Sequence, residues 1–591
     1  MKRNNNTKYK KIIGKRLVSL LVSLVFVICA FYVDATINED NPVVSPKVLA
    51  ASDADDPVFK HVPENSNNIS VSIEDLTAYS QACAEYHKYH QNDNLTILGS
   101  TGDTKYFEAG FQGLGTSTYP FAGSVTIENN ANVTLNLDAP LFNYVLDSVV
   151  LNNGHDIKIA REYSSSRTDI AHTTPILAAH VIHDEDNSSA SWNVIIDQPS
   201  DDKDDISYNL EEFGGVIGTM EENASLTVSV TMNTTEDDTD SIKITGADDL
   251  GFACCTMEDG SSLDFTLTAT RGIDSIITKK GNVGGLVGTI GSGASFEYSG
   301  SNIQENSSDI KTSSSGYAGG VSGSNSGTVT INSTPYVIKQ NIEGTNGSGG
   351  VYGNFVPSSD LTINTSDYTI NCEVNGKGVT GGLFGLLDSE YDITISGSGT
   401  IKSSHYSGSA SAYGGLIGKY KTDSKTRTLT IGSVTTETHK SGSSTYYGGG
   451  IGLIDDMNPS YVKFDGFTVN KAYDAGALTF GGLVASADNT FVDANNVTIA
   501  VDGKFKGGAM VGHIDHGIVR LTGSTTITNA KSAVPTVNDN TDESKYVGQL
   551  VGYRDNALVF ADSGWQYNRY KDNVLVDDIG SWVKCSDILL S

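Results

Sequence analysis

The sequence has few of the residues that would favour a helical, disulfide-rich or zinc-binding protein. Among 591 residues there are 6 cysteines, 12 prolines and 3 tryptophans. None of the cysteines are spaced as CxxC, so zinc-ribbon and dithiol redox functions have no support. Charged residues make up only 18% of the chain, whereas Gly, Ser, Thr, Asn and Asp are abundant. This composition favours strands and turns over helices and predicts an all-β protein.

Positive charge is also scarce, and much of it lies at the N-terminus. Seven Lys and Arg residues precede an apolar run over 17–33 and a small-x-small site, Val33-Asp34-Ala35. This pattern predicts a signal peptide over 1–35 and a secreted or cell-surface location. The alternative is a retained anchor, for which the run is short. Removing 1–35 takes away seven positive charges and Asp34, so the net charge becomes −31 − 6 = −37. Such a surface repels nucleic acid and anionic lipid, so we expect no nucleic-acid partner and no membrane insertion after cleavage.

The segment that follows the predicted signal peptide has two parts. Residues 36–67 are acidic, contain four prolines and show no periodicity, which predicts a disordered linker. Ser72-Ile73-Glu74-Asp75 resembles a capping box, and apolar residues then recur at helical spacing, which predicts a helix over about 73–90. We therefore assign 68–110 to a capping helix and a first strand.

A glycine-rich pentad, G-G-L-V-G, recurs through the rest of the chain. Its steps are 27–40 residues, apart from one step of 70 in which "LGFACC" (250–255) is interpreted as a degenerate copy. "APLFN" (139–143) and "TPILA" (174–178) are weaker copies still. A fixed period with varying detail indicates a solenoid. The ten clear copies begin at Gly214, Gly284, Gly319, Gly349, Gly381, Gly414, Gly448, Gly481, Gly508 and Gly548.

Each pentad is followed by a polar turn and an alternating strand, for example "SFEYSG". With about three short strands per repeat, this pattern predicts a parallel β-helix over 111–591. The glycines would serve corners that need positive φ or close backbone approach. Adjacent Leu and Val cannot both enter the core from one extended strand, so either the pentad bends or both faces of that wall are covered. The third pentad residues would stack as an apolar ladder of Leu286, Val321, Val351, Leu383, Leu416, Leu483, Met510 and Leu550.

From Gly214 to Gly552 these repeats resemble the GLUG motif of Gram-positive, clostridial-type surface proteins. The segments 111–130 and 546–565 also resemble flanking segments of adhesin-like members. The resemblance implies a β-solenoid used for adhesion or display, and the motif carries no catalytic residue. No LPxTG-like sorting signal follows Trp582, so we expect a freely released chain, one held by a partner, or a truncated form of a longer protein.

Several groups are candidate sites, and none is predicted to be catalytic, cofactor-binding or metal-binding. His513, Asp515 and His516 in "GHIDHG" are the strongest catalytic or metal candidate, against a solvated turn. The paired aspartates 248–249, 455–456 and 577–578 match glycosidase carboxylates or turn formers. The acidic runs 184–187, 201–205 and 236–240 could hold calcium but lack the spacing of an EF-hand loop. The tyrosine-containing turns 403–408 and 444–449 could contact sugars or proteins, or pack on a neighbouring coil.

The sequence thus predicts an exported, non-enzymatic β-solenoid that displays a binding surface. Glycans or proteins of a host or neighbouring cell are the expected partners, and no cofactor is expected, with calcium as the alternative. A β-helix polysaccharide lyase or glycosidase is the rival interpretation, because that fold also carries such enzymes. A purely structural spacer is the third.

Overall fold

The structure is a computed structural model in which the placement of 24 segments is described. All of them belong to Val62–Ser591, the second of two compact units. The described residues are 68–72, 75–81, 92–98, 105–106, 111–128, 134–137, 139–151, 157–160, 174–197, 212–233, 243–269, 273–302, 304–332, 335–405, 409–422, 426–440, 443–455, 459–473, 477–502, 507–529, 550–561, 566–571, 574–575 and 589–590. The predicted signal peptide and acidic linker lie outside them.

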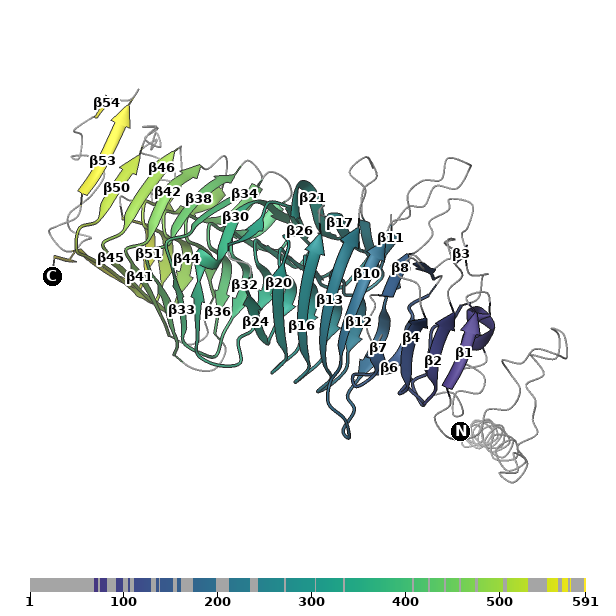
Figure 1. Ribbon diagram of the computed structural model, residues 1–591. Coiled ribbons are helices and arrows are strands. Elements are labelled where there is room, and N and C mark those ends of the chain that lie inside the picture. The colour runs from purple at the N-terminus through teal and green to yellow at the C-terminus, as the bar shows by residue number, and fades with distance from the viewer. Residues whose placement is uncertain are drawn as a thin grey trace, which may run out of the picture. The chain divides into compact units, whose positions relative to one another are not determined.

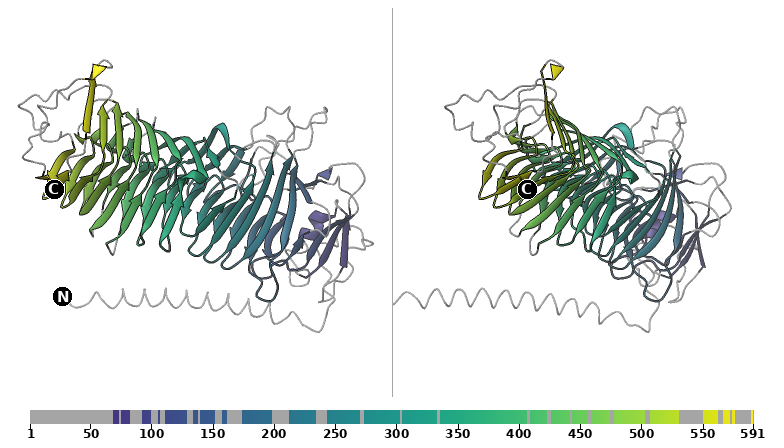
Figure 2. Two further views of the ribbon diagram at one scale, coloured as in Figure 1. Left: turned by 60° about the vertical axis from the view of Figure 1, so that its left-hand side comes forward. Right: turned by 90° about the vertical axis from the view of Figure 1, so that its left-hand side faces the viewer.

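The described part of this unit is a parallel β-solenoid, which confirms the predicted fold class. The chain passes from one sheet to the next and returns to the same sheet one coil later, so successive strands of each sheet lie side by side (Figure 1). Among the described strands every pairing is parallel except that of β53 with β54. Further views show the same stacking from two other directions (Figure 2).

Six sheets, here called A to F, contain these strands. Sheet A has β1 (Asn68–Ser72), β2 (Asn94–Leu98), β4 (Ser124–Glu128) and β7 (Val150–Leu151). Sheet B has β3 (Lys105–Tyr106), β5 (Thr134–Asn136), β8 (Ile157–Ala160), β10 (Ser191–Asp197), β13 (Ser225–Asn233), β16 (Ser262–Ala269), β20 (Ser295–Gly300) and β24 (Thr328–Ile331). Sheet F has β29 (Leu361–Asn364), β33 (Ile393–Ser396), β37 (Thr428–Ile431), β41 (Ser460–Asp465), β45 (Thr490–Asn495), β49 (Ile518–Thr522), β52 (Leu558–Ala561) and β55 (Leu589–Leu590).

Sheets C and D run along most of the solenoid, and sheet E lies along its later part. Sheet C has β6 (Phe142–Leu146), β9 (Ala178–Ile182), β12 (Ile217–Met220), β15 (Cys254–Met257), β19 (Val287–Ile290), β23 (Ser322–Asn325), β28 (Tyr352–Phe355), β32 (Phe384–Asp388), β36 (Ile417–Lys421), β40 (Ile451–Ile454), β44 (Val484–Asp488), β48 (Val511–Asp515) and β51 (Val551–Asp555). Sheet D has β11 (Glu212–Phe213), β14 (Lys243–Gly246), β17 (Ile273–Thr278), β21 (Gln304–Thr312), β26 (Asn341–Gly344), β30 (Tyr368–Gly376), β34 (Thr400–His405), β38 (Thr435–Lys440), β42 (Thr468–Tyr473), β46 (Thr498–Asp502), β50 (Thr526–Asn529), β53 (Gln566–Lys571) and β54 (Val574–Leu575), and β25 (Tyr336–Ile338) also pairs with β30. Sheet E has β18 (Val283–Gly284), β22 (Tyr317–Gly319), β27 (Gly347–Gly349), β31 (Val379–Gly381), β35 (Ser409–Gly414), β39 (Ser443–Gly448), β43 (Ala477–Gly481) and β47 (Gly507–Gly508).

From β18 to β50 each coil has four principal strands, not the three that the repeat length suggested, and in the last coil the structure describes β51, β52 and β53. The order along the chain is sheet E, sheet C, then sheet B or F, then sheet D. The extra strand arises because the pentad divides one wall in two: β18 ends at Gly284 and β19 begins at Val287. Residues 285–286 form the bend between them.

This bend settles the question of how adjacent Leu and Val can both be inside. Leu286 and Val287 lie on either side of the corner, and both are fully buried. A side chain on Gly284 would place its Cβ 1.9 Å from the carbonyl oxygen of Val287. The first pentad glycines from Gly284 to Gly508 all meet the oxygen of the residue three positions on, at 1.8–2.2 Å. Close backbone approach therefore explains the glycine at this position.

The predicted apolar ladder is confirmed. All eight of its residues are buried, from Leu286 to Leu550. Backbone hydrogen bonds run from coil to coil along it, as from Leu286 N to Val321 O at 3.0 Å and from Val321 N to Val351 O at 2.9 Å. The degenerate copies stack in the same sheet, because Phe142 pairs with Ala178, Ala178 with Ile217, and Ile217 with Cys254. Ala178 is the fifth residue of "TPILA" whereas Phe142 and Ile217 are the fourth of their copies, so this copy begins one residue later than predicted.

The predicted N-terminal helix is described only over residues 76–81. Its expected cap is present, since Asp75 N donates to Ser72 Oγ at 3.3 Å and Ser72 Oγ donates to Asp75 Oδ2 at 2.6 Å. Parallel pairing begins before this helix, with β1 against β2, and hence earlier than the predicted solenoid boundary at 111. Helix elsewhere in the described residues is limited to one 3-10 turn, Thr365–Asp367. None of the helical segments that the structure describes has the length and apolar character needed to cross a membrane.

Candidate ligand-binding face

Sheets B and F occupy the same place in the coil, directly after sheet C, but they do not pair with each other. In sheet B the outward side chains of β13, β16, β20 and β24 are Ser, Thr, Asp and Glu. In sheet F the outward side chains change along the rod from hydroxyls to large apolar and charged groups. We call the later group the aromatic face. Its members are Tyr461, Lys463, Phe491, Asp493, Ile518, Arg520, Leu558 and Phe560 on β41, β45, β49 and β52.

The parallel register places these side chains in two neighbouring columns. Tyr461, Phe491, Ile518 and Leu558 are partners on four successive strands. The rings of Tyr461 and Phe491 stack with centroids 4.9 Å apart, and the guanidinium of Arg520 lies 5.2 Å from the centroid of Phe491. Leu558 is 47% exposed. A single exposed leucine is ordinary, whereas here four large apolar side chains follow one another on one outer face.

The second column contains a buried charged network. Asp493 faces outward, yet it is only 3% exposed, because Arg520 and Tyr461 cover it. Arg520 Nε donates to Asp493 Oδ1 at 2.9 Å and Arg520 Nη2 to Oδ2 at 2.5 Å. Tyr461 Oη donates to Oδ2 at 2.8 Å. The bidentate pair fixes the orientation of the Arg520 guanidinium.

The protonation of this network follows from its contacts. Burial alone would raise the pKa of Asp493, but the hydrogen bonds from Arg520 and Tyr461 and the positive charge of Arg520 outweigh it, so this pKa is held below its usual value. Burial, followed by the hydrogen bond to Asp493, raises the pKa of the Tyr461 hydroxyl. Asp493 is thus a carboxylate and Tyr461 a neutral donor at neutral pH.

A second feature is the column at the corner where sheet C ends, which we call the corner column. It contains the seventh residue after the first glycine of each pentad. Counted from the clear copies and from Gly251 of the degenerate copy, these residues are Glu221, Glu258, Gly291, Ser326, Val356, Asp388, Lys421, Asp455, Asp488, Asp515 and Asp555. Lys421 Nζ lies 3.4 Å from Asp388, and Lys419 Nζ lies 2.6 Å from Asp455. These two carboxylates are therefore neutralised within the column and its neighbour.

The "GHIDHG" residues lie at this corner. His513 and Asp515 share the outer face of β48, but the ring of His513 packs on Tyr553 with centroids 5.1 Å apart. His516 instead turns toward Asp515, with Nδ1 2.8 Å from Asp515 Oδ1. The third member of this group is Asp488 rather than His513. Sequence reasoning missed Asp488 because it lies 27 residues before Asp515, although both occupy the seventh position after a pentad glycine.

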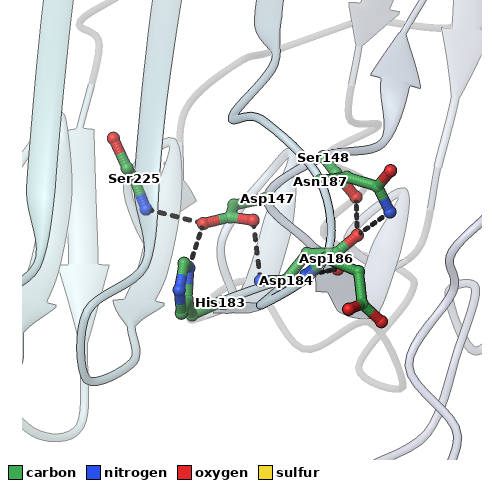
Figure 3. A network of polar contacts seen from close by, with 7 residues as sticks. All are labelled: Asp147, Ser148, His183, Asp184, Asp186, Asn187 and Ser225. Carbon is green, nitrogen blue, oxygen red and sulfur yellow. Dashed lines mark hydrogen bonds and ion pairs between the residues drawn. The ribbon is translucent and has the colours of Figure 1, made fainter.

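A third polar cluster joins three coils near β6 and β9 (Figure 3). Buried Asp147 accepts hydrogen bonds from the backbone N of Asp184 at 2.9 Å and of Ser225 at 2.9 Å. It also contacts His183 Nδ1 at 3.1 Å. Donors from Ser148, Asn187 and the backbone of Asp186 surround the carboxylate of Asp184. The hydrogen bond from Ser148 lowers the pKa of Asp184 most, followed by that from Asn187. Because protein donors satisfy both carboxylates, this cluster fixes the turns and accounts for the acidic run 184–187.

The other candidates make protein contacts or lie outside the described residues. Asp248 pairs with Lys280 at 3.0 Å, and Asp249 accepts from Asn282 N at 2.7 Å. The predicted turn 444–449 is instead strand β39, in which Tyr447 is buried and its hydroxyl bonds that of Thr438, as expected for packing between coils. In the predicted turn 403–408, residues 403–405 instead end strand β34, where His405 is buried, and 406–408 lie outside the described residues. Asp456, residues 577–578 and the acidic runs 201–205 and 236–240 lie outside the described residues.

The cysteines described by the structure are free thiols. Cys254 and Cys372 are buried, and Cys255, beside Cys254, is also a free thiol. Burial raises the pKa of the Cys372 thiol to about 12. These residues are therefore packing residues with little thiolate character at neutral pH.

Comparison of the chain with known protein families, characterised proteins and solved structures gives no significant match. The function is therefore argued from the geometry of the molecule alone.

Proposed function

We propose that this protein is an exported, non-enzymatic β-solenoid that presents the aromatic face to glycans or proteins on the surface of a host or neighbouring cell. The observation that carries the proposal is the column Tyr461, Phe491, Ile518 and Leu558, which interrupts an otherwise polar series of outer faces. Aromatic side chains and Arg supply much of the energy in protein interfaces.

The scaffold suits this role because it is stiff and its side chains are in fixed register. Successive strands lie about 4.8 Å apart, so contacts made by one coil are repeated at a similar spacing by the next. Weak contacts repeated along a rigid rod gain strength through avidity. The Asp493–Arg520 pair adds a guanidinium whose orientation is already set before a ligand arrives.

Binding of the purified protein to glycan arrays and to cells tests the proposal. We expect Phe491→Thr combined with Tyr461→Thr to lower binding about tenfold or more, because two aromatic contacts are lost. Thr is the residue found at the matching position of β37, Thr428, so the substituted face keeps a side chain that this sheet already accepts. Thr330→Ala on the outer face of sheet B is the matched control and should leave binding unchanged.

A β-helix polysaccharide lyase or glycosidase is the second candidate. It is favoured by the carboxylates of Asp488 and Asp515, which stack on adjacent coils beside the aromatic face. The same glycans, assayed for new reducing ends and unsaturated uronates, separate the two functions. Turnover that disappears in Asp488→Asn would establish the enzyme, whereas binding without turnover supports display.

A further inference from the structure

Two consecutive coils bring three potential ligand groups together at the corner between sheets C and F. Asp488 ends β44, Asp515 ends β48, and His516 follows directly. One carboxylate oxygen from each aspartate and one imidazole nitrogen lie within 4.8 Å of one another. The two aspartates belong to the corner column and His516 follows the second, so the stacking of coils brings Asp488 to a pair that is adjacent in sequence.

The protein itself leaves these groups incompletely satisfied. Oδ1 of Asp488 is shielded from solvent and receives no hydrogen bond. Nδ1 of His516 lies 2.8 Å from Oδ1 of Asp515, but the contact does not have the geometry of a hydrogen bond. Two ligands of one metal ion, each at 2.0–2.2 Å from it, lie about 3 Å apart. The separation of these two atoms therefore matches a pair of ligands aimed at a common ion.

Other members of the corner column show how the protein satisfies a carboxylate when no ion is needed. Asp388 and Asp455 have lysine partners at 3.4 and 2.6 Å. Among the ion pairs of the described residues, Asp488 has no cationic partner and Asp515 has only His516. Like charges on directly paired strands repel, so this pair of carboxylates needs a positive charge that the lysines do not supply.

The histidine itself stands where its neighbours have asparagine. The residue after the corner aspartate is Asn489, His516 and Asn556 in three successive coils, and all three have positive φ, at 48°, 48° and 47°. Asparagine tolerates this left-handed conformation better than most residues. In the middle coil His516 thus replaces the asparagine that this backbone conformation favours, and its side chain lies beside both carboxylates. Asn556 Nδ2 lies 3.3 Å from His516 Nε2. A neutral imidazole that binds a metal through Nδ1 carries its proton on Nε2, so ion binding requires the Asn556 amide to present its oxygen to Nε2.

We infer that Asp488, Asp515 and His516 form a binding site for a divalent first-row transition-metal ion such as Zn²⁺. Two carboxylate oxygens and an imidazole nitrogen form a ligand set suited to Zn²⁺, whereas Ca²⁺ prefers oxygen ligands alone. The bound ion neutralises the two stacked carboxylates and joins two consecutive coils at the edge of the aromatic face. This site is independent of whether that face binds a glycan or a protein.

Titration of the metal-free protein with Zn²⁺, followed by calorimetry, tests the assignment. We expect one site that is lost or weakened about tenfold or more in His516→Asn and in Asp488→Asn. His516→Asn is the sharper variant, because asparagine already occupies this corner in the flanking coils and should preserve the fold by circular dichroism. Asp388→Asn is the matched control, since Asp388 lies in the same column and already has Lys421.

Co²⁺ provides a second measurement, because its visible spectrum reports nitrogen and oxygen ligation and its near-ultraviolet bands report thiolates. A visible spectrum that lacks thiolate bands and disappears in His516→Asn supports the site. The assignment would be overturned if the protein failed to bind Zn²⁺ or if His516→Asn bound Zn²⁺ with unchanged affinity. It would also be overturned if only Ca²⁺ bound and its affinity were the same in His516→Asn.

Discussion

Sheets B and F are built on the same plan but present different surfaces. Inward residues are equivalent in the two sheets: Leu263 and Phe296 in sheet B and Val462 and Val492 in sheet F are all fully buried. Outward residues differ, with Asp264 and Glu297 adjacent on sheet B and Asp493 and Arg520 adjacent on sheet F. Packing thus constrains one side of each strand and leaves the other free to acquire a function.

The outward aspartates of the two sheets differ in the effect of their charge on stability. Burial, and then the nearby Glu297 carboxylate, raises the pKa of Asp264. The pKa of Asp493 is instead lowered, since Arg520 and Tyr461 overcome the effect of burial. Negative charge therefore opposes folding on sheet B and supports it on sheet F.

The largest loss of stability should come from substitutions of the first pentad glycine, at the corner that precedes both sheets in each coil. Gly284→Ala, before sheet B, and Gly414→Ala, before sheet F, would each place a Cβ within 1.9 Å of a carbonyl oxygen. We expect each to lower the free energy of unfolding by about 3 kcal/mol, measured by urea denaturation. Gly432→Ala is the control, because its nearest atom would be 3.6 Å away, and it should change stability by less than about 1 kcal/mol. Equal effects at all three positions would remove close approach as the reason for the pentad glycine.

A smaller loss of stability is expected from Arg520→Ala, which removes the guanidinium that covers Asp493 on sheet F. Asp493 would then lose its bidentate partner, and we expect a loss of about 2 kcal/mol at pH 7 by urea denaturation. Because the pKa of Asp493 is lowered in the folded protein, its stabilising contribution is present above about pH 4. It is lost as the pH falls through the folded-state pKa, so the difference between the two proteins should shrink in acid.

Lys402→Ala is the control for this prediction. The Lys402–Glu437 pair is 3.5 Å apart, and both side chains are at least a third exposed, so its loss should cost less than about 0.5 kcal/mol. An Arg520→Ala protein as stable as Lys402→Ala would show that burial of Asp493 does not make its partner important.

The smallest effect, and one of opposite sign, should come from sheet B. Asp264→Asn removes a charge that opposes folding, and we expect a gain of about 0.5 kcal/mol at pH 7 in the same denaturation assay. The raised pKa of Asp264 means that protonation relieves the same cost, so the gain should disappear as the pH falls through that pKa. Thr227→Asn, one coil away in the same column, should show neither a gain nor a pH dependence. A loss of stability in Asp264→Asn would contradict the proposed difference between the two sheets.

Much of the fold could be predicted because every coil of a solenoid needs the same residue types at the same corner and inward positions. The pentad fixed the register: Leu286, Val321 and Val351 were aligned in sequence and are stacked in space. The degenerate copy "LGFACC" also lies where it was expected, between two clear copies, since Cys254 pairs with both Ile217 and Val287. The number of strands per coil was wrong, because a run of apolar residues does not reveal that Gly284 ends one strand and Val287 begins another.

The candidate sites were less accessible to sequence reasoning. Asp515 and His516 were recognised because they are adjacent, whereas Asp488 was not, because it comes from the preceding coil. Tyr461, Phe491 and Ile518 lie in separate repeats, and each looks like an ordinary strand residue in its own. Counting positions from each pentad glycine would have aligned the corner column, since Asp488 and Asp515 both fall at the seventh position.

The sequence by itself determined that this chain coils into stacked parallel strands, because a glycine needed for close approach must recur wherever the same corner recurs. Only the tertiary structure decided which outward side chains meet. Contacts across a strand ladder join residues about one coil apart in sequence, and small changes in turn length from coil to coil set which of them become neighbours.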